Sequence, residues 1–128
     1  MSLEDYEGVR DRLQAVLDAR PWEEISPNGP TEAKLLQGAV VDALRPLGQV
    51  SSEIPVRFTG GRRGRVDVFL ECSTGTTVAI ELDRGRPRAK SVQKLQSLEA
   101  DVRLICLRRP WRQRGPHPKI DAVISPVG

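Results

Sequence analysis

Apolar residues recur with two different periods along this chain, and the two periods predict an order of helices and strands. The first pattern is helical, covers residues 3–19 and ends before Pro21. A second helical pattern has Glu32 in its first turn and ends near Pro46 and Gly48. Both ends follow the usual rule that Pro and Gly terminate helices, so we expect two amphipathic helices before any strand begins.

After the second helix the period changes to two, the spacing of a half-buried strand. Pro55 lies within the first strand pattern and predicts an edge strand or a bulge there, because Pro cannot donate to a sheet. The basic, glycine-rich residues 59–64 predict a flexible hairpin loop. The remaining patterns predict strands over residues 50–58, 65–71, 77–83 and 102–107, a helix over 88–99 before the last of these, and an edge strand over 120–125.

This order predicts one α/β domain over residues 1–128, with a mixed central sheet of about four to five strands flanked by helices. A right-handed crossover through the helix at 88–99 should set the strand at 102–107 parallel to the strand at 77–83. The core should span about residues 30–107, followed by a basic, Pro-rich segment over 108–128. The N-terminus is acidic and no apolar run nears the roughly 18–20 residues of a membrane span, so we expect a cytoplasmic protein.

Acidic residues interrupt two of the predicted apolar strands. Because side chains alternate between the faces of a strand, Asp67 should share a face with Glu71, and Glu81 should share a face with Asp83. Burying several carboxylates together is costly unless a cation or hydrogen bonds satisfy them. The pattern therefore predicts a divalent metal site on one surface of the sheet, with oxygen ligands from Asp67, Glu81, Asp83 and a backbone carbonyl such as that of Leu82.

The sequence is poor in the residues that other hydrolytic chemistries use. His117 is the one histidine and lies in a Pro-rich stretch, which argues against Ser-His-Asp triads, HNH-type nucleases and His-rich zinc sites. Cys72 and Cys106 are the two cysteines, and we expect both to be reduced and buried. Mg²⁺ or Mn²⁺ is therefore favoured over a metal that needs His or Cys ligands.

The formal charge of +3 hides a division between the two parts of the chain. Residues 54–128 contain 15 basic and 7 acidic residues, a net charge of +8. Arginine binds phosphate in a bidentate way, so this part of the chain suits a polyanion such as DNA. Trp111 lies within one arginine cluster, where it either stacks on a base or packs on its own domain. The candidate DNA-binding residues are Arg62, Arg63, Arg65, Arg84, Arg86, Arg88, Arg108, Arg109 and Arg112, with Arg57, Arg103 and Arg114 nearby.

The chain contains, in this order, a helical Glu, an Asp at the start of a strand, a Glu on the next strand and a basic helix. This arrangement resembles the PD-(D/E)XK nuclease superfamily. The resemblance covers about residues 30–107. It implies a restriction-endonuclease-like fold in which Asp67 and Glu81 bind the metal. It also implies that Glu32 is the helical carboxylate found in many members.

The chain departs from the family pattern at one position. Asp83 stands two residues after Glu81, where the family has a lysine that positions or activates water. Some members have moved this lysine to a nearby element. On a helical wheel Lys94 falls nearer the apolar stripe than Lys90, so we expect Lys94 first and Lys90 second to supply the charge. Asp83 is then a third metal ligand, or activity has been lost.

The resulting hypothesis is a metal-dependent DNA endonuclease. Alternatives are a catalytically inactive nuclease-fold protein that binds nucleic acid or a protein partner, and an unrelated α/β enzyme that uses the carboxylates as acid and base. With one small site in each chain, cleavage of both strands requires a homodimer or two separate nicks. The sequence does not name the DNA structure recognised, because base readout depends on a few loop side chains.

Overall fold

The computed structural model describes residues 2–113 and 116–127 and is an α/β structure, as the sequence predicts. The described residues form three α-helices, three short 3₁₀ turns and five strands. No helix among them is long and apolar enough to cross a membrane. In chain order the elements are α1 (Leu3–Ala19), α2 (Glu32–Leu44), β1 (Gly48–Phe58), β2 (Arg62–Cys72), β3 (Thr77–Asp83), α3 (Ala89–Gln96), β4 (Val102–Leu107) and β5 (Ala122–Ile124).

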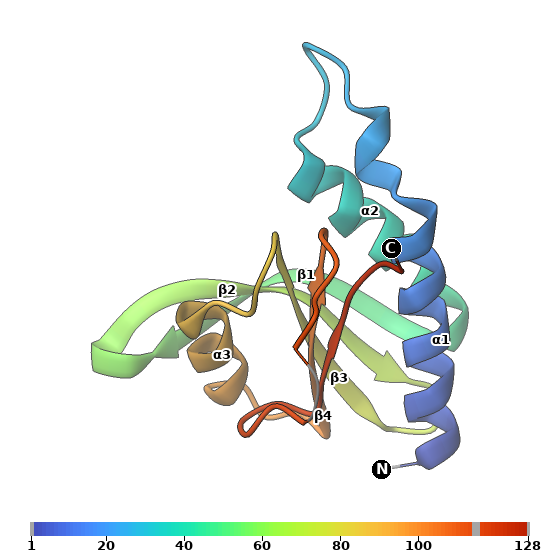
Figure 1. The fold of residues 1–128 in the computed structure, drawn as a ribbon. Coiled ribbons are helices and arrows are strands. Elements are labelled where there is room, and N and C mark those ends of the chain that lie inside the picture. Colours follow the sequence, from blue (N-terminus) through green and yellow to red (C-terminus); the bar gives the residue numbers. More distant parts are fainter. Residues whose placement is uncertain (1, 114–115, 128) are drawn as a thin grey trace.

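The five strands form one mixed sheet in the order β1-β2-β3-β4-β5 (Figure 1). The first three strands are antiparallel neighbours, and β4 lies parallel to β3 after the crossover through α3. This confirms the predicted parallel pairing of the two strands. Strand β1 lies at the edge of the sheet, which explains why Pro55 is tolerated within it. The last strand, β5, is shorter than the predicted 120–125 and pairs parallel to β4.

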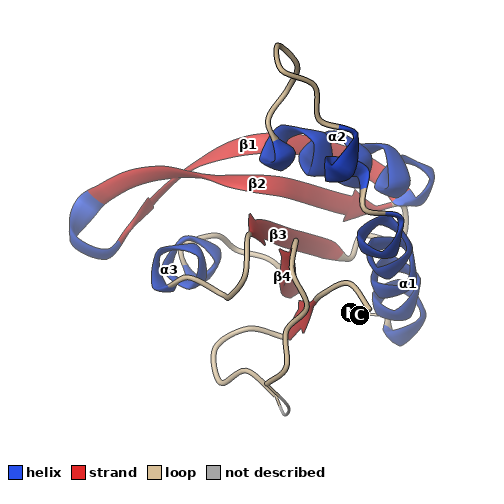
Figure 2. Cartoon of the chain, turned by 45° about the horizontal axis from the view of Figure 1, so that its top comes forward, coloured by secondary structure: helices blue, strands red, loops and turns tan. Residues whose placement is uncertain are grey.

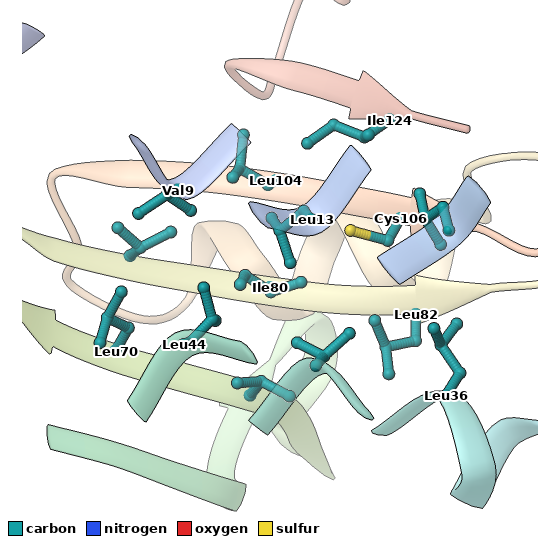
Figure 3. Close-up of a cluster of buried hydrophobic side chains, with 14 of the residues drawn as sticks. Val9, Leu13, Leu36, Leu44, Leu70, Ile80, Leu82, Leu104, Cys106 and Ile124 are labelled. Carbon is teal, nitrogen blue, oxygen red and sulfur yellow. The ribbon is translucent and has the colours of Figure 1, made fainter. Parts of the chain in front are cut away.

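Helices cover both faces of the sheet. On one face α1 and α2 bury a cluster that includes Leu13, Leu44 and Ile80, drawn in Figure 3. On the other face α3 packs against a second cluster through Val92 and Leu95. The buried cysteines, Cys72 and Cys106, are free thiols, as expected.

The hairpin between β1 and β2 differs from the sequence prediction. The loop was expected over residues 59–64, but only Thr59–Gly61 form the turn, and both strands continue up to it. Gly60 and Gly61 have φ values of 73° and 75°, a region that glycine enters without strain. Figure 2 shows the resulting hairpin extending past the rest of the sheet and curving over α3.

Helix α3 is also shorter than the predicted 88–99. The Arg103 guanidinium donates hydrogen bonds to the carbonyls of Leu95, Leu98 and Ala100 at 2.7–3.0 Å. The bond to Leu95 takes the place of the one that a longer helix would supply from the N–H of residue 99, and the other two bonds hold the chain that follows the helix. Arg103, which belongs to the basic set of the sequence, therefore has a structural role.

Candidate functional site

Strands β2 and β3 separate at the position of the two predicted metal-binding carboxylates. Their pairing runs from Glu71 opposite Thr77 to Val68 opposite Ile80 and then stops, although both strands continue. The next residues in this register are Asp67 and Glu81. The structure thus brings together the two side chains that the sequence singles out.

Each of these carboxylates accepts a hydrogen bond from the backbone of the other strand. The Asp67 N–H donates to Glu81 Oε2, and the Leu82 N–H donates to Asp67 Oδ2, both at 2.8 Å. The two side chains therefore replace the ladder bonds that are lost where the strands separate. Because the N–H and C=O of a strand residue point to the same side, the Leu82 carbonyl faces the same gap.

Lys94 completes this group from α3. Its ammonium forms an ion pair with Glu81 Oε1 and donates a hydrogen bond to the Arg65 carbonyl at 2.9 Å. The side chains of Glu81 and Lys94 are only 1% and 10% exposed. The structure thus supports the preference for Lys94 over Lys90, which is exposed.

The position of Lys94 depends on a glycine that the sequence analysis did not single out. A Cβ atom on Gly64 would lie 3.0 Å from Lys94 Cδ and 2.9 Å from the Phe58 ring. Because Gly64 has no side chain, the aliphatic part of the Lys94 side chain can pass beneath the hairpin at this point. Gly64 stands between two arginines in the sequence, and that setting alone suggested only a flexible loop.

Burial raises the pKa of Glu81 from its ordinary 4.5 to about 8. The Asp67 carboxylate, through its charge and hydrogen bonding, acts in the same direction, and Lys94 opposes the increase without cancelling it. Glu81 therefore holds its proton more tightly than an ordinary glutamate. A cation that binds beside Asp67 has to displace that proton.

Asp67 is the more accessible of the two acids. It is half-buried, and within residues 2–113 and 116–127 no hydrogen bond reaches its Oδ1 atom. Gln37 of α2 donates to the Asp67 carbonyl at 3.0 Å and holds the backbone of β2 at this point. Sequence reasoning missed Gln37, since a polar residue on an amphipathic helix carries no distinguishing signal.

The contacts of Asp83 do not favour the prediction that it is a third metal ligand. Both of its oxygens are taken by the start of α3: Oδ2 by the Arg88 N–H at 3.0 Å, and Oδ1 by Arg88 Nε and Ser91 Oγ at 2.9 and 2.8 Å. In the part of the chain that the structure describes, no three His, Cys, Asp or Glu side chains are grouped to hold a metal ion. Asp83 is an anchor for α3.

Glu32 does not join the two strand carboxylates either. One of its oxygens lies 3.4 Å from both Arg108 Nε and Arg109 Nη2, so it ties the start of α2 to the end of β4. In the structure Glu32 therefore makes ion pairs, and the prediction that it is a catalytic carboxylate gains no support from these contacts.

Most of the candidate DNA-binding arginines are exposed, with the exceptions of Arg108 and Arg109. Arg65 pairs with Glu53 at 3.3 Å, and Arg62 lies over the Phe58 ring. Arg114 lies outside the described residues. Trp111 is half-buried and packs against the core cluster beneath α3.

Comparison of the chain with protein-family models, with curated proteins and with solved structures finds no match. The functional argument therefore depends on the geometry of Asp67, Glu81 and Lys94.

Proposed function

We propose that this protein is a divalent-metal-dependent endonuclease that hydrolyses phosphodiester bonds in DNA, as its resemblance to the PD-(D/E)XK nucleases implies. One observation carries the proposal: Asp67 and Glu81 meet where β2 and β3 separate, and Lys94 reaches the same point from α3. Two carboxylates and one lysine from three different elements converge on a gap in the sheet. A purely structural ion pair needs only one of the two acids.

The donor set fits Mg²⁺ or Mn²⁺. Mg²⁺ commonly binds one or two carboxylates and completes its octahedron with water and substrate phosphate, so a third protein carboxylate is not required. Asp67 Oδ1, a Glu81 oxygen and the Leu82 carbonyl are the donors we assign to it. Bound there, the ion would neutralise charge on the phosphoryl group and lower the pKa of a bound water.

The remaining roles belong to the protein's own residues. The Lys94 ammonium lies against Glu81 and offers a positive charge and hydrogen-bond donors to a water or a phosphate oxygen at the gap. The Asp67 and Leu82 backbone N–H groups hold the two carboxylates in place. Arg62 and Arg63 on the β1–β2 hairpin are exposed, and in this proposal they contact the DNA backbone.

The alternative is a nuclease-fold protein that binds nucleic acid or a protein partner without cleaving a substrate. It is favoured by the engagement of both Glu81 oxygens within the protein, one with the Asp67 N–H and one with Lys94. In that case the three side chains form a buried structural network.

Incubation with supercoiled plasmid and with branched DNA distinguishes the two functions. We expect nicking with Mg²⁺ or Mn²⁺, none with EDTA, and loss of nicking in Asp67→Asn with the fold retained. Glu71→Gln is the matched control, because Glu71 is an exposed acid on the same strand. The alternative is supported if the protein retards DNA on a gel but never nicks it, and if Asp67→Asn binds DNA as tightly as the wild type does.

A further inference from the structure

The two loops that follow β3 and β4 lie together and carry a concentration of positive charge. Because β3 and β4 are parallel, their carboxyl ends meet at one edge of the sheet. The N–H groups of Arg108 and Arg109 both donate to the Arg84 carbonyl, at 2.9 and 3.0 Å, and this ties the loops to each other. Six arginines lie on these loops: Arg84, Arg86, Arg88, Arg108, Arg109 and Arg112.

Carboxylates neutralise only part of this charge. Asp83 pairs with Arg88, and Glu32 pairs with Arg108 and Arg109. Within the described ranges the other three arginines of the loops make no ion pair. Six cations thus face two acids, and arginines held this close together without counter-charges repel one another. An anion bound between them would relieve that repulsion.

An open pocket of about 520 Å³ lies on this edge, lined by Arg84, Gly85, Arg86, Arg88 and Trp111. We call it the arginine pocket. Trp111 is fixed in the wall of the pocket, because its indole packs on the core cluster beneath α3 and its backbone N–H donates to Ser125 Oγ at 3.2 Å. The space around Gly85 is open, because a Cβ atom at this position would have no neighbouring side chain within 4 Å. The pocket therefore offers one held aromatic surface among exposed guanidinium groups.

We propose that the arginine pocket binds an unpaired DNA strand, with a base against Trp111 and the adjacent phosphates on Arg84 and Arg86. Arginines alone would suit duplex DNA equally well. An indole needs a base whose face is free, and such a face is offered by a single strand and not by the interior of a duplex. The mixture of aromatic and basic side chains is what single-strand binding sites use.

The pocket lies close to the candidate nuclease site along β3. Arg84 follows Glu81 by three residues, roughly 10 Å of extended strand. That distance corresponds to about three nucleotides of a DNA strand whose bases are stacked. If the protein has the proposed nuclease function, its substrate is DNA with an unpaired segment beside the cut, such as a flap or branch.

The first experiment measures binding in EDTA, which separates recognition from cleavage. A fluorescently labelled oligo-dT and a blunt duplex of equal length are titrated at low salt and followed by anisotropy. We expect the single strand to bind more tightly. Trp111→Ala should weaken single-strand binding roughly 5- to 150-fold, the loss typical of one stacked base. Trp22 is buried, so quenching of intrinsic tryptophan fluorescence by unlabelled oligo-dT should come from Trp111.

Matched variants guard against loss of folding. Trp111→Tyr keeps an aromatic face and should recover most of the binding. Arg86→Ala alters an exposed side chain and should weaken binding, whereas Arg45→Ala, which removes an exposed arginine paired with Asp42 in the turn before β1, should not. Circular dichroism confirms that each variant is folded. Equal affinity for duplex and single strand, or unchanged binding in folded Trp111→Ala and Arg86→Ala, overturns the proposal.

Cleavage assays keep this inference apart from the proposed nuclease function. Preferential single-strand binding that depends on Trp111, without nicking in Mg²⁺ or Mn²⁺, supports the arginine pocket and counts against the nuclease. Nicking that is lost in Asp67→Asn but is the same for branched and linear duplexes in wild type and in Trp111→Ala supports the nuclease and overturns the pocket's role.

Discussion

Replacing Glu81 by Gln removes the buried carboxyl at the centre of the candidate site and should change how stability depends on pH. In the folded protein Glu81 releases its proton near pH 8, whereas in the unfolded chain the release occurs near the ordinary value of 4.5. Between these pH values the folded state binds more protons than the unfolded state. The free energy of unfolding therefore falls as pH rises through this window.

The size of the effect follows from the two pKa values. One pH unit of difference is worth about 1.4 kcal/mol, so a pKa raised from 4.5 to about 8 corresponds to roughly 5 kcal/mol in full. Glu81 is fully buried, so solvent screening does not reduce this figure much. Most of the loss, roughly 4 kcal/mol, should occur between about pH 5 and about pH 8.

The assay is urea unfolding of the wild type and Glu81→Gln across that range, with EDTA present. The other titratable groups are common to both proteins, so the difference between their unfolding free energies isolates Glu81. We expect the wild type to lose stability relative to the variant as pH rises. Mg²⁺ added at the alkaline end should restore stability to the wild type but much less to the variant, because binding to the folded state stabilises it.

Two results would refute this reasoning. If the difference in unfolding free energy between the wild type and Glu81→Gln does not change with pH, Glu81 titrates normally in the folded state. If the wild type instead gains stability relative to the variant as pH rises, the ion pair with Lys94 outweighs burial and the Asp67 charge. In that case the pKa of Glu81 is lowered, and the group is a stable ion pair that has no proton for a metal to displace.

Three further outcomes can be measured. The raised pKa of the buried glutamate predicts that nicking at limiting Mg²⁺ rises about tenfold for each pH unit up to about pH 8, since the metal must displace a proton; a flat profile contradicts this. Lys94→Met should reduce nicking about a hundredfold or more, whereas Lys90→Met, which changes an exposed residue, should stay within a few-fold. Gly48→Ala should cost at least about 2 kcal/mol in thermal or urea unfolding because its Cβ would enter the backbone of β2, and Gly38→Ala on α2, where no atom lies within 4 Å, should be neutral or stabilising.

Much of the fold follows from local patterns in the sequence. The helical spacing places α1 at the predicted residues 3–19, and the alternating and continuous apolar runs place β3 and β4 at 77–83 and 102–107. These patterns succeed because each element buries a face whose period is set by its own backbone geometry. The crossover direction follows from the handedness of such connections.

The errors occur where distant residues decide the local structure. Helix α3 ends early, and Arg103 on the following strand donates to the Leu95 carbonyl near its end and to the Leu98 and Ala100 carbonyls that follow it. The hairpin turn is tighter than expected because Gly60 and Gly61 adopt positive φ in succession. Neither the partner of a guanidinium nor the φ of a glycine can be read from hydrophobic spacing.

For the site, strand alternation pointed to the acids of the two strands, the resemblance singled out Asp67 and Glu81 among them, and the helical wheel placed Lys94 before Lys90. The role of Asp83 could not be found in this way. The N-cap residue of α3, Arg88, provides no side-chain cap for the helix. The backbone N–H of Arg88 is satisfied by Asp83, a residue of the preceding strand. A weak capping signal at the start of a helix is thus the one sequence feature that suggests an acid elsewhere must supply the cap.

This anchoring gives a physical reason for the acid at position 83. Asp83 holds Ser91 in the first turn of α3, and Lys94 lies one turn later on the same side of the helix. The carboxylate at position 83 therefore fixes the helix that brings Lys94 to Glu81. A lysine at position 83 would remove the acceptor for the Arg88 N–H and for Ser91 Oγ at the start of α3. The acid at position 83 and the position of Lys94 are thus consequences of one packing arrangement.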